Sequence, residues 1–256
     1  MNKNIPERFI PAIQQIKNLQ RNSRYFGAFV FGSIVRGETT SQSDLDVKVV
    51  IDKDSCKNIN HPFINGVKLD VSFYSFKQLG ELLEHQTEKN ERPPMIAESI
   101  ILFDTTGKLK ELQKKYQAIK PKKYSDKEYQ LVQFLTFFAN QKVEDNLKTN
   151  PTEALFSMYV NVNDLLKTHY KIHGRWWVSD KNLFKDLALW DATLLKIVED
   201  FVIENEVNKK FALWSQMIDY ILEPLGGRQK IEDNNCNCKD CQTDLANLLS
   251  GSVNFV

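Results

Sequence analysis

The sequence of 256 residues has no long apolar run. A helix that spans a membrane needs about 20 consecutive apolar residues, so we expect no membrane span. The N-terminal stretch MNKNIPERFIPAIQQ also lacks the apolar segment of a signal peptide. Cysteine is scarce, with four residues in the chain, and this argues against a disulfide framework. Together these absences predict a cytoplasmic protein.

A basic excess is missing as well. Lys and Arg number 34 against 33 Asp and Glu, so the formal net charge is +1. Proteins that bind long nucleic acids usually carry a basic excess or a basic face, and we therefore expect no nucleic acid partner. The sequence has no Walker A, HExxH or GxSxG motif, so it gives no sign of a P-loop, a zinc metalloprotease site or a nucleophile elbow.

Three of the four cysteines form a C-x-C-x-x-C pattern near the end of the chain, at Cys236, Cys238 and Cys241. Thiolates at this spacing could hold Zn²⁺, but a structural zinc site takes four ligands. Cys56 or a histidine from elsewhere would have to supply the fourth. We expect reduced thiols on a polar tail over about 232–256, with a zinc site as the alternative.

The first 120 residues predict a mixed α/β domain. Apolar spacing indicates an amphipathic helix over residues 6–21. Strands are predicted over residues 25–31, 46–51, 67–74 and 100–103. The third of these, VKLDVSFY, alternates apolar and polar residues and is expected to be half-buried. Ser75 and Gln78 form a capping box that predicts a helix from there to about residue 86.

Beyond residue 120 the pattern becomes helical. A polar linker is predicted over residues 121–128, and helical spacing recurs over 131–138, 155–166, 183–189, 194–202 and 211–222. We expect the apolar stripes on these segments to form a core; the first stripe consists of Leu131, Phe134, Leu135 and Phe138. The predicted fold class is α+β: an N-terminal mixed-sheet domain with flanking helices over residues 1–120, followed by a helical bundle over residues 121–256.

Two carboxylates, Asp44 and Asp46, stand at the start of the second predicted strand. In an extended chain, residues i and i+2 point to the same face about 7 Å apart. Carboxylates this close repel each other unless a cation lies between them, and oxygen ligands suit Mg²⁺. Asp70, on the polar face of the next strand, could complete the set. Paired Mg²⁺ ions bound there would suit phosphoryl transfer.

A Gly-Ser turn follows the first predicted strand. Gly32 allows the backbone to come close to a ligand, and Ser33 offers a hydroxyl and an N–H group where a short helix begins. A triphosphate would fit there, with Arg36 adding a charge-assisted contact. A Gly-Ser turn, a D-x-D pair or a strand aspartate is by itself usually structural. The ordered combination is what indicates phosphate chemistry.

This combination, G-S-x-x-x-G-x-x-x-x-x-S-D-L-D followed by KLDVSFYS and ILFDTTGKL, resembles the polymerase-β-like nucleotidyltransferase superfamily. The resemblance covers about residues 25–115, and Ser43 belongs to its first motif. Within the superfamily, the order of the parts is most similar to the antibiotic nucleotidyltransferases, including the kanamycin type. The rest of the chain is similar to these enzymes only in being helical.

The resemblance implies an enzyme that transfers a nucleoside monophosphate, by default AMP from ATP, to a hydroxyl of a small acceptor such as an aminoglycoside. Pyrophosphate is released. Gly32, Ser33, Arg36 and Ser43 would contact the nucleotide, and Asp44, Asp46 and Asp70 would be the catalytic ligands of two Mg²⁺ ions. Two alternatives remain: a protein-adenylylating enzyme of the toxin–antitoxin kind, and a decayed nucleotide-binding module. The three intact carboxylates argue against decay.

The general base and the acceptor site are less defined. Kanamycin-type enzymes use a glutamate of the helical domain, where this chain offers Phe137 and Phe138, so Glu144 and Glu98 are the candidates. The segment HGRWWVSD, residues 173–180, lies between predicted helices and is expected to line a cleft or a dimer interface. A cleft shared between two chains would make the protein a homodimer.

Overall fold

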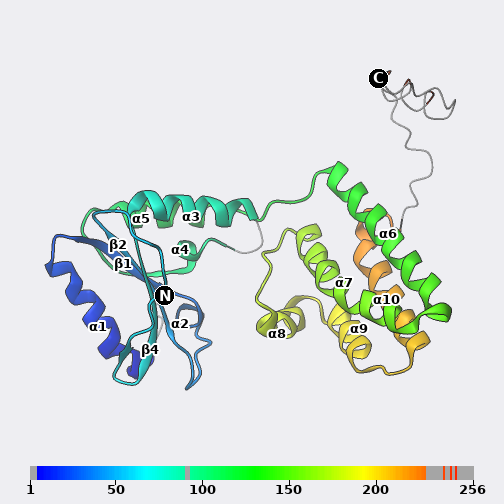
Figure 1. Cartoon of the computed structure of the whole chain (residues 1–256), viewed down its shortest axis with the longest axis horizontal. Coiled ribbons are helices and arrows are strands. Elements are labelled where there is room, and N and C mark those ends of the chain that lie inside the picture. The colour runs from blue at the N-terminus through cyan, green and yellow to red at the C-terminus, as the bar shows by residue number, and fades with distance from the viewer. Residues whose placement is uncertain (1–4, 90–92, 229–238, 240–242, 244–245, 247–256) are drawn as a thin grey trace, which may run out of the picture. The chain divides into compact units, whose positions relative to one another are not determined.

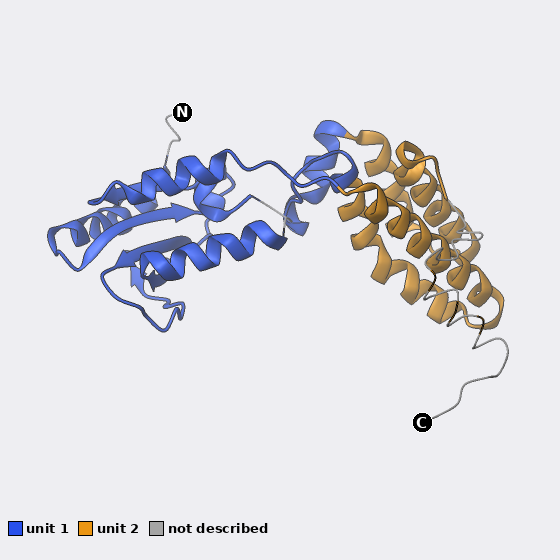
Figure 2. Ribbon diagram, turned by 90° about the horizontal axis from the view of Figure 1, so that it is seen from above, with its two compact units in different colours: residues 1–123, 170–190 blue, residues 124–169, 191–256 orange. Residues whose placement is uncertain are grey.

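The structure is a computed structural model that describes residues 5–89 and 93–228, together with residues 239, 243 and 246. The chain forms two compact units (Figure 2). The first comprises Met1–Lys123 and Tyr170–Trp190, and the second comprises Tyr124–His169 and Asp191–Val256. Within the described ranges no helix is both long and apolar enough to cross a membrane. Cys236, Cys238 and Cys241 lie outside the described residues.

A five-stranded sheet organises the first unit, with the strand order β3-β4-β2-β1-β5 (Figure 1). The strands are β1 (Tyr25–Phe31), β2 (Leu45–Ile51), β3 (Phe63–Ile64), β4 (Val67–Tyr74) and β5 (Ile100–Asp104). β2 and β4 run parallel, whereas the other neighbours are antiparallel. The predicted mixed sheet is confirmed. The two-residue β3 is too short for a sequence pattern to reveal.

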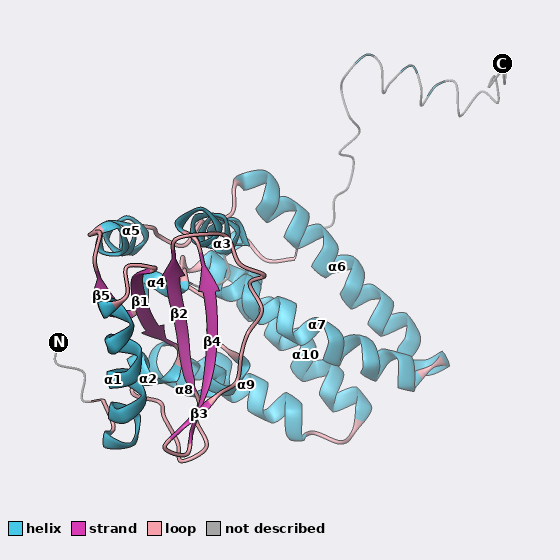
Figure 3. Ribbon diagram, turned by 60° about the vertical axis from the view of Figure 1, so that its left-hand side comes forward, coloured by secondary structure: helices cyan, strands magenta, loops and turns pink. Residues whose placement is uncertain are grey.

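Helices cover both faces of this sheet (Figure 3). The helical elements of the first 123 residues are η1 (Glu7–Phe9), α1 (Ile10–Asn18), η2 (Leu19–Arg21), α2 (Ser33–Arg36), α3 (Phe76–Lys89), α4 (Met95–Glu98) and α5 (Lys108–Gln117). α1 packs on one face against alternate residues of β1 and β2. α3, α4 and α5 pack on the other face around Phe29 and Val50. The two faces of β2 therefore belong to two different hydrophobic cores.

The polar face of β4 differs from the prediction. Ser72 is fully buried and Tyr74 is 7% exposed, whereas Lys68 and Asp70 on the same face stay partly exposed, so only the second half of this face is covered. Tyr74 joins the core that includes Leu79 and Leu83 of α3. The capping box that starts α3 is present as predicted, because Gln78 N donates to Ser75 Oγ at 3.2 Å and Ser75 N donates to Gln78 Oε1 at 3.2 Å.

The first unit also contains a helical segment from later in the chain, which ends with α8 (Asp180–Trp190). Tyr170 is almost fully buried there, and its hydroxyl donates to Asp186 at 2.6 Å. The rings of Trp177 and Trp190 lie edge-on to Tyr170, with centroids 5.1 and 5.2 Å away. This aromatic cluster fixes the Trp176–Trp177 segment to α8.

The second unit is built mainly from α6 (Asp126–Thr149), α7 (Pro151–Ile172), α9 (Ala192–Ile203) and α10 (Val207–Leu222). The prediction that the first apolar stripe forms core is wrong for α6. Leu131, Leu135 and Phe138 are 53%, 55% and 48% exposed. α6 instead buries Gln133 and Asn140, and the Gln133 amide donates to the carbonyls of Leu225 and Gly227. The Gln133 amide can donate hydrogen bonds to these carbonyls, whereas the apolar side chains of the stripe cannot.

Candidate functional site

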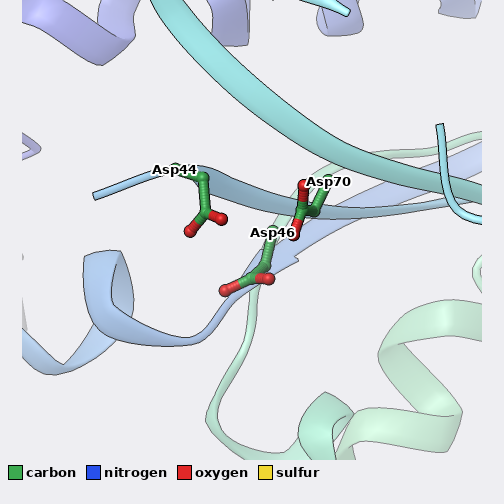
Figure 4. Close-up of side chains that lie close together, drawn as sticks. All are labelled: Asp44, Asp46 and Asp70. Atoms are coloured by element: carbon green, nitrogen blue, oxygen red, sulfur yellow. The ribbon is translucent and has the colours of Figure 1, made fainter. Parts of the chain in front are cut away.

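The three predicted carboxylates come together where the start of β2 lies beside the middle of β4 (Figure 4). Asp46 lies on β2 and is the direct register partner of Asp70 on the parallel strand β4. Asp44 precedes the first residue of β2. One carboxylate oxygen from each residue lies within 4.8 Å of the other two. This spacing allows all three side chains to bind the same cations.

The charges of this acidic triad, Asp44, Asp46 and Asp70, act most strongly on its central member. Burial, together with the negative charges of Asp44 and Asp70, raises the pKa of Asp46 to about 6. Each of these effects disfavours a third negative charge at this position. A divalent cation would remove the penalty, and hard oxygen ligands match Mg²⁺. The donor set therefore fits the metal that the sequence predicts.

Asp70 has two nitrogen-bearing neighbours, a histidine and a lysine. His61 Nδ1 lies 2.6 Å from Asp70 Oδ1, and Lys68 Nζ lies 3.1 Å from the same oxygen. Burial pulls the pKa of Asp70 upward, but the hydrogen bonds from His61 and Lys68 outweigh it and place the pKa below its usual range. Lys68 was detectable, because residues i and i+2 of a strand share a face. His61 comes from the loop before β3 and carried no such signal.

A buried lysine stands behind the triad. Lys48 is 6% exposed, follows Asp46 on the same face of β2, and donates from Nζ to Ser72 Oγ at 2.5 Å. Burial lowers the pKa of Lys48, and the charges of Asp46 and Asp70 oppose that change. Lys48 thus supplies a positive charge that partly balances the carboxylates. A lysine inside an apolar strand pattern is the signal that could have identified it.

Gly32 fits against the triad closely. It has φ +77°, and a Cβ atom added there would lie 2.1 Å from Asp46 Oδ2. Any side chain at this position would displace the carboxylate. The glycine is required both by the backbone conformation and by the approach of Asp46.

The other predicted nucleotide contacts have different surroundings. Arg36 Nε donates to Glu38 Oε2 at 2.9 Å, and Arg36 also lies 3.8 Å from Glu98. Ser33 is 9% exposed and is not among the described residues that line the neighbouring cleft. The hydroxyl of Ser43 accepts a hydrogen bond from the Thr40 N–H at 2.8 Å. Nucleotide contacts by these residues stay predictions.

A cleft of about 820 Å³ opens beside Gly32 and Asp46 within the first unit. Arg36, Glu98 and the Trp176–Trp177 pair line it, so the sequence-predicted tryptophan segment does face a cleft. Its size is in the range of small-molecule sites. Asp46, the central member of the triad, thus lines the same space as Gly32 and the aromatic wall.

The family model described as a nucleotidyltransferase domain matches residues 13–145, which is more than half of the chain. The chain belongs to this family. The match contains β1–β5 and the whole acidic triad. The protein is therefore a nucleotidyltransferase, and the matched domain is the part of the chain that carries the triad.

A nucleotidyltransferase-like protein from Exiguobacterium sibiricum 255-15 is similar with 14% sequence identity and a TM-score of 0.45. The similarity covers 96% of this chain and 88% of that chain. No curated protein matches the sequence.

The two candidates for the general base lie in different units. Glu98 of α4 lines the cleft, whereas Glu144 lies on α6 of the second unit. We expect Glu98→Gln to lower kcat by about 10²-fold or more, because a positioned base contributes 10²–10⁴-fold. The KM for the nucleotide should change little. Steady-state kinetics of Glu98→Gln and Glu144→Gln provide the measurement, and a larger loss in Glu144→Gln than in Glu98→Gln would contradict this prediction.

Proposed function

We propose that this nucleotidyltransferase transfers a nucleoside monophosphate, by default AMP from ATP, to a hydroxyl group of a small acceptor. Asp44, Asp46 and Asp70 would hold Mg²⁺, and two ions are the number that the resemblance implies. The observation that carries the proposal is the acidic triad packed against Gly32 at the edge of an 820 Å³ cleft. An enzyme of this kind would use cytoplasmic ATP, and we propose the cytoplasm as its location.

The residues of this chain have separate roles in the proposed reaction. The acceptor oxygen forms a bond to the α-phosphorus, and the bond from that phosphorus to the bridging oxygen breaks, so that pyrophosphate leaves. Bound Mg²⁺ would supply Lewis-acid stabilisation of the phosphoryl oxygens. Gly32 leaves room for the Asp46 carboxylate beside the cleft. The acceptor proton passes to Glu98 or Asp70; the short Asp70 side chain is already bonded to His61 and Lys68, which favours Glu98.

The cleft also bears on the acceptor class. The resemblance to kanamycin-type enzymes makes aminoglycosides the first acceptors to test, and these are polycations. Two acidic side chains of the cleft wall already have partners: Glu38 accepts from Arg36 and Asn182, and Asp186 accepts from Tyr170 and Trp190. Three lysines, Lys89, Lys181 and Lys185, also line the wall, and the charge of Lys185 acts on Glu38. This distribution supports neutral hydroxyl acceptors as a second class.

A pyrophosphate-release screen tests the proposal. It crosses the four NTPs with aminoglycosides, lincosamides and small neutral sugars, and uses Asp44→Ala as the blank. We expect release with ATP and at least one acceptor, and a loss of at least about 10³-fold in Asp44→Ala, because a ligand of the metal is removed. Asp52→Ala is the matched control, since Asp52 is exposed and lies 3.8 Å from Arg24 at the far end of β2.

The outcomes of the screen separate the alternatives. Equal activity in Asp44→Ala and wild type would contradict the assignment of the site. Release that requires a protein acceptor would favour the adenylylating enzyme of the toxin–antitoxin kind. Sedimentation velocity on the same preparation tests whether the protein forms the proposed homodimer.

A further inference from the structure

One arginine far from the triad in sequence holds the loop that ends at Asp44. The guanidinium of Arg8 donates three hydrogen bonds to main-chain carbonyls. Arg8 Nη1 lies 2.6 Å from Ser41 O, and Nη2 lies 2.6 Å from Thr40 O and 2.7 Å from Ser43 O. These are short, charge-assisted bonds with a fork geometry that arginine provides and lysine does not.

The loop supplies acceptors for several of its own N–H groups, and one of the three carbonyls, Thr40 O, also accepts from within the loop. Within it, Thr40 N donates to Ser43 Oγ at 2.8 Å, Ser43 N to Thr40 O at 3.2 Å, and Gln42 N to Thr40 Oγ1 at 3.3 Å. The turn is therefore closed by local bonds from the N–H side. Donors from another element add a long-range link to this locally closed turn. Arg8 provides them from an element 32 to 35 residues earlier.

Arg8 is itself fixed by the core. It lies in η1, and the next residue, Phe9, is fully buried between α1 and the sheet. The guanidinium carbon lies 4.2 Å from the centroid of the Phe9 ring. The guanidinium is thus both stacked on a buried ring and hydrogen-bonded to the loop, so the core helps to fix its position.

Asp44 needs such support more than the other two members of the triad. Asp46 and Asp70 lie in paired strands, where the β2–β4 ladder sets their positions. Asp44 precedes β2 and has no register partner in that ladder. Its preceding residue, Ser43, is the one whose carbonyl Arg8 binds at 2.7 Å.

We propose that Arg8 is a positioning residue that sets the backbone of Asp44 and thereby the geometry of the cation site. The proposal rests on the proposed function, because it assumes that the triad binds a divalent cation. Residues that orient metal ligands through hydrogen bonds commonly change metal affinity by 10–100-fold when they are removed. A purely structural role for Arg8 would lower stability without this loss.

The test is Mn²⁺ binding to the full chain, measured by isothermal titration calorimetry. We expect Arg8→Gln to weaken the Mn²⁺ affinity by about 10–100-fold and Arg8→Lys to recover part of it, since lysine keeps the charge but loses the fork. Arg24→Gln is the matched control, because Arg24 is an exposed arginine of the same unit with a 3.8 Å pair to Asp52. It should bind Mn²⁺ as wild type does. Thermal unfolding of each variant is recorded alongside to confirm that the chain is folded.

A second measurement keeps this proposal separate from the proposed function. Hydrogen–deuterium exchange without metal should be faster in Arg8→Gln at the amides of residues 38–44 and unchanged in α3 and α5. Unaltered exchange in residues 38–44, or a Mn²⁺ affinity in Arg8→Gln equal to that of wild type, would overturn the role of Arg8. By contrast, if wild type bound Mn²⁺ no better than Asp46→Asn does, the cation site itself would be overturned. The hydrogen–deuterium exchange of residues 38–44 would then decide by itself whether Arg8 holds the loop.

Discussion

Asp46→Asn is expected to abolish nucleotidyl transfer and, in the absence of metal, to stabilise the fold. The activity loss follows because Asp46 is the central carboxylate of the triad. The gain in stability follows because burial and the charges of Asp44 and Asp70 raise the pKa of Asp46 from 3.8 to about 6. At neutral pH the wild-type fold bears the cost of a carboxylate that its surroundings disfavour. Asparagine has a similar shape and no charge.

The pH dependence of this effect has a definite sign. A carboxyl group with a raised pKa in the folded state costs nothing below its unfolded pKa of 3.8, and the full cost is present above about pH 6. The shift corresponds to at most about 3 kcal/mol, because one pKa unit is 1.36 kcal/mol. We therefore expect the free energy of unfolding of Asp46→Asn to exceed that of wild type at pH 7.5, and the difference to shrink as the pH falls from 6 to 4.

Calorimetric unfolding in EDTA at pH 4.5 and pH 7.5 measures this difference. Mg²⁺ added at pH 7.5 should raise the unfolding temperature of wild type and leave that of Asp46→Asn unchanged, because a ligand stabilises only the state that binds it. Asp52→Asn is the control, since Asp52 is about half exposed. Equal stability of Asp46→Asn and wild type at both pH values would show that the triad does not strain the fold.

The sequence predicted the parts of the triad but not their alignment. Gly32, Asp44, Asp46 and Asp70 were all identified from motif order and strand alternation. Their meeting depends on the parallel register of β2 and β4, which pairs Asp46 with Asp70 directly. A slip of one residue would turn every side chain of a strand to the other face. No local pattern in either strand specifies this register.

The residues that surround the triad were missed for related reasons. Lys48 interrupts an apolar strand, and its burial follows only once α3 and α5 cover that face of the sheet. Arg8 lies more than 30 residues before its partners in the loop. The apolar stripe of α6 was predicted as core because periodicity identifies a face and not what packs against it. Local structure was thus predictable, and long-range partners were not.

Gly32→Ala is expected to remove activity with a modest loss of stability. Gly32 has φ +77° and ψ −147°, a conformation that is close to glycine-only and would cost an alanine about 1–3 kcal/mol. The added Cβ would also lie 2.1 Å from Asp46 Oδ2. The fold can relieve this contact by rotating the Asp46 side chain, because its oxygen is the end of a short side chain. That rotation takes the central ligand away from Asp44 and Asp70.

The comparison that isolates the collision is Gly107→Ala. Gly107 has the same φ of +77°, but a Cβ there would have nothing within 4 Å. Gly107 has ψ −14°, in the left-handed region, so Gly107→Ala should lose less stability in thermal unfolding than Gly32→Ala. We expect kcat to fall by at least about 10²-fold only in Gly32→Ala, as a displacement of about 1 Å at a reacting centre does. Weaker Mn²⁺ binding in Gly32→Ala should accompany the loss. If Gly107→Ala lost as much activity as Gly32→Ala, backbone strain and not the contact with Asp46 would be the cause, and the packing of Gly32 against the triad would have no catalytic role.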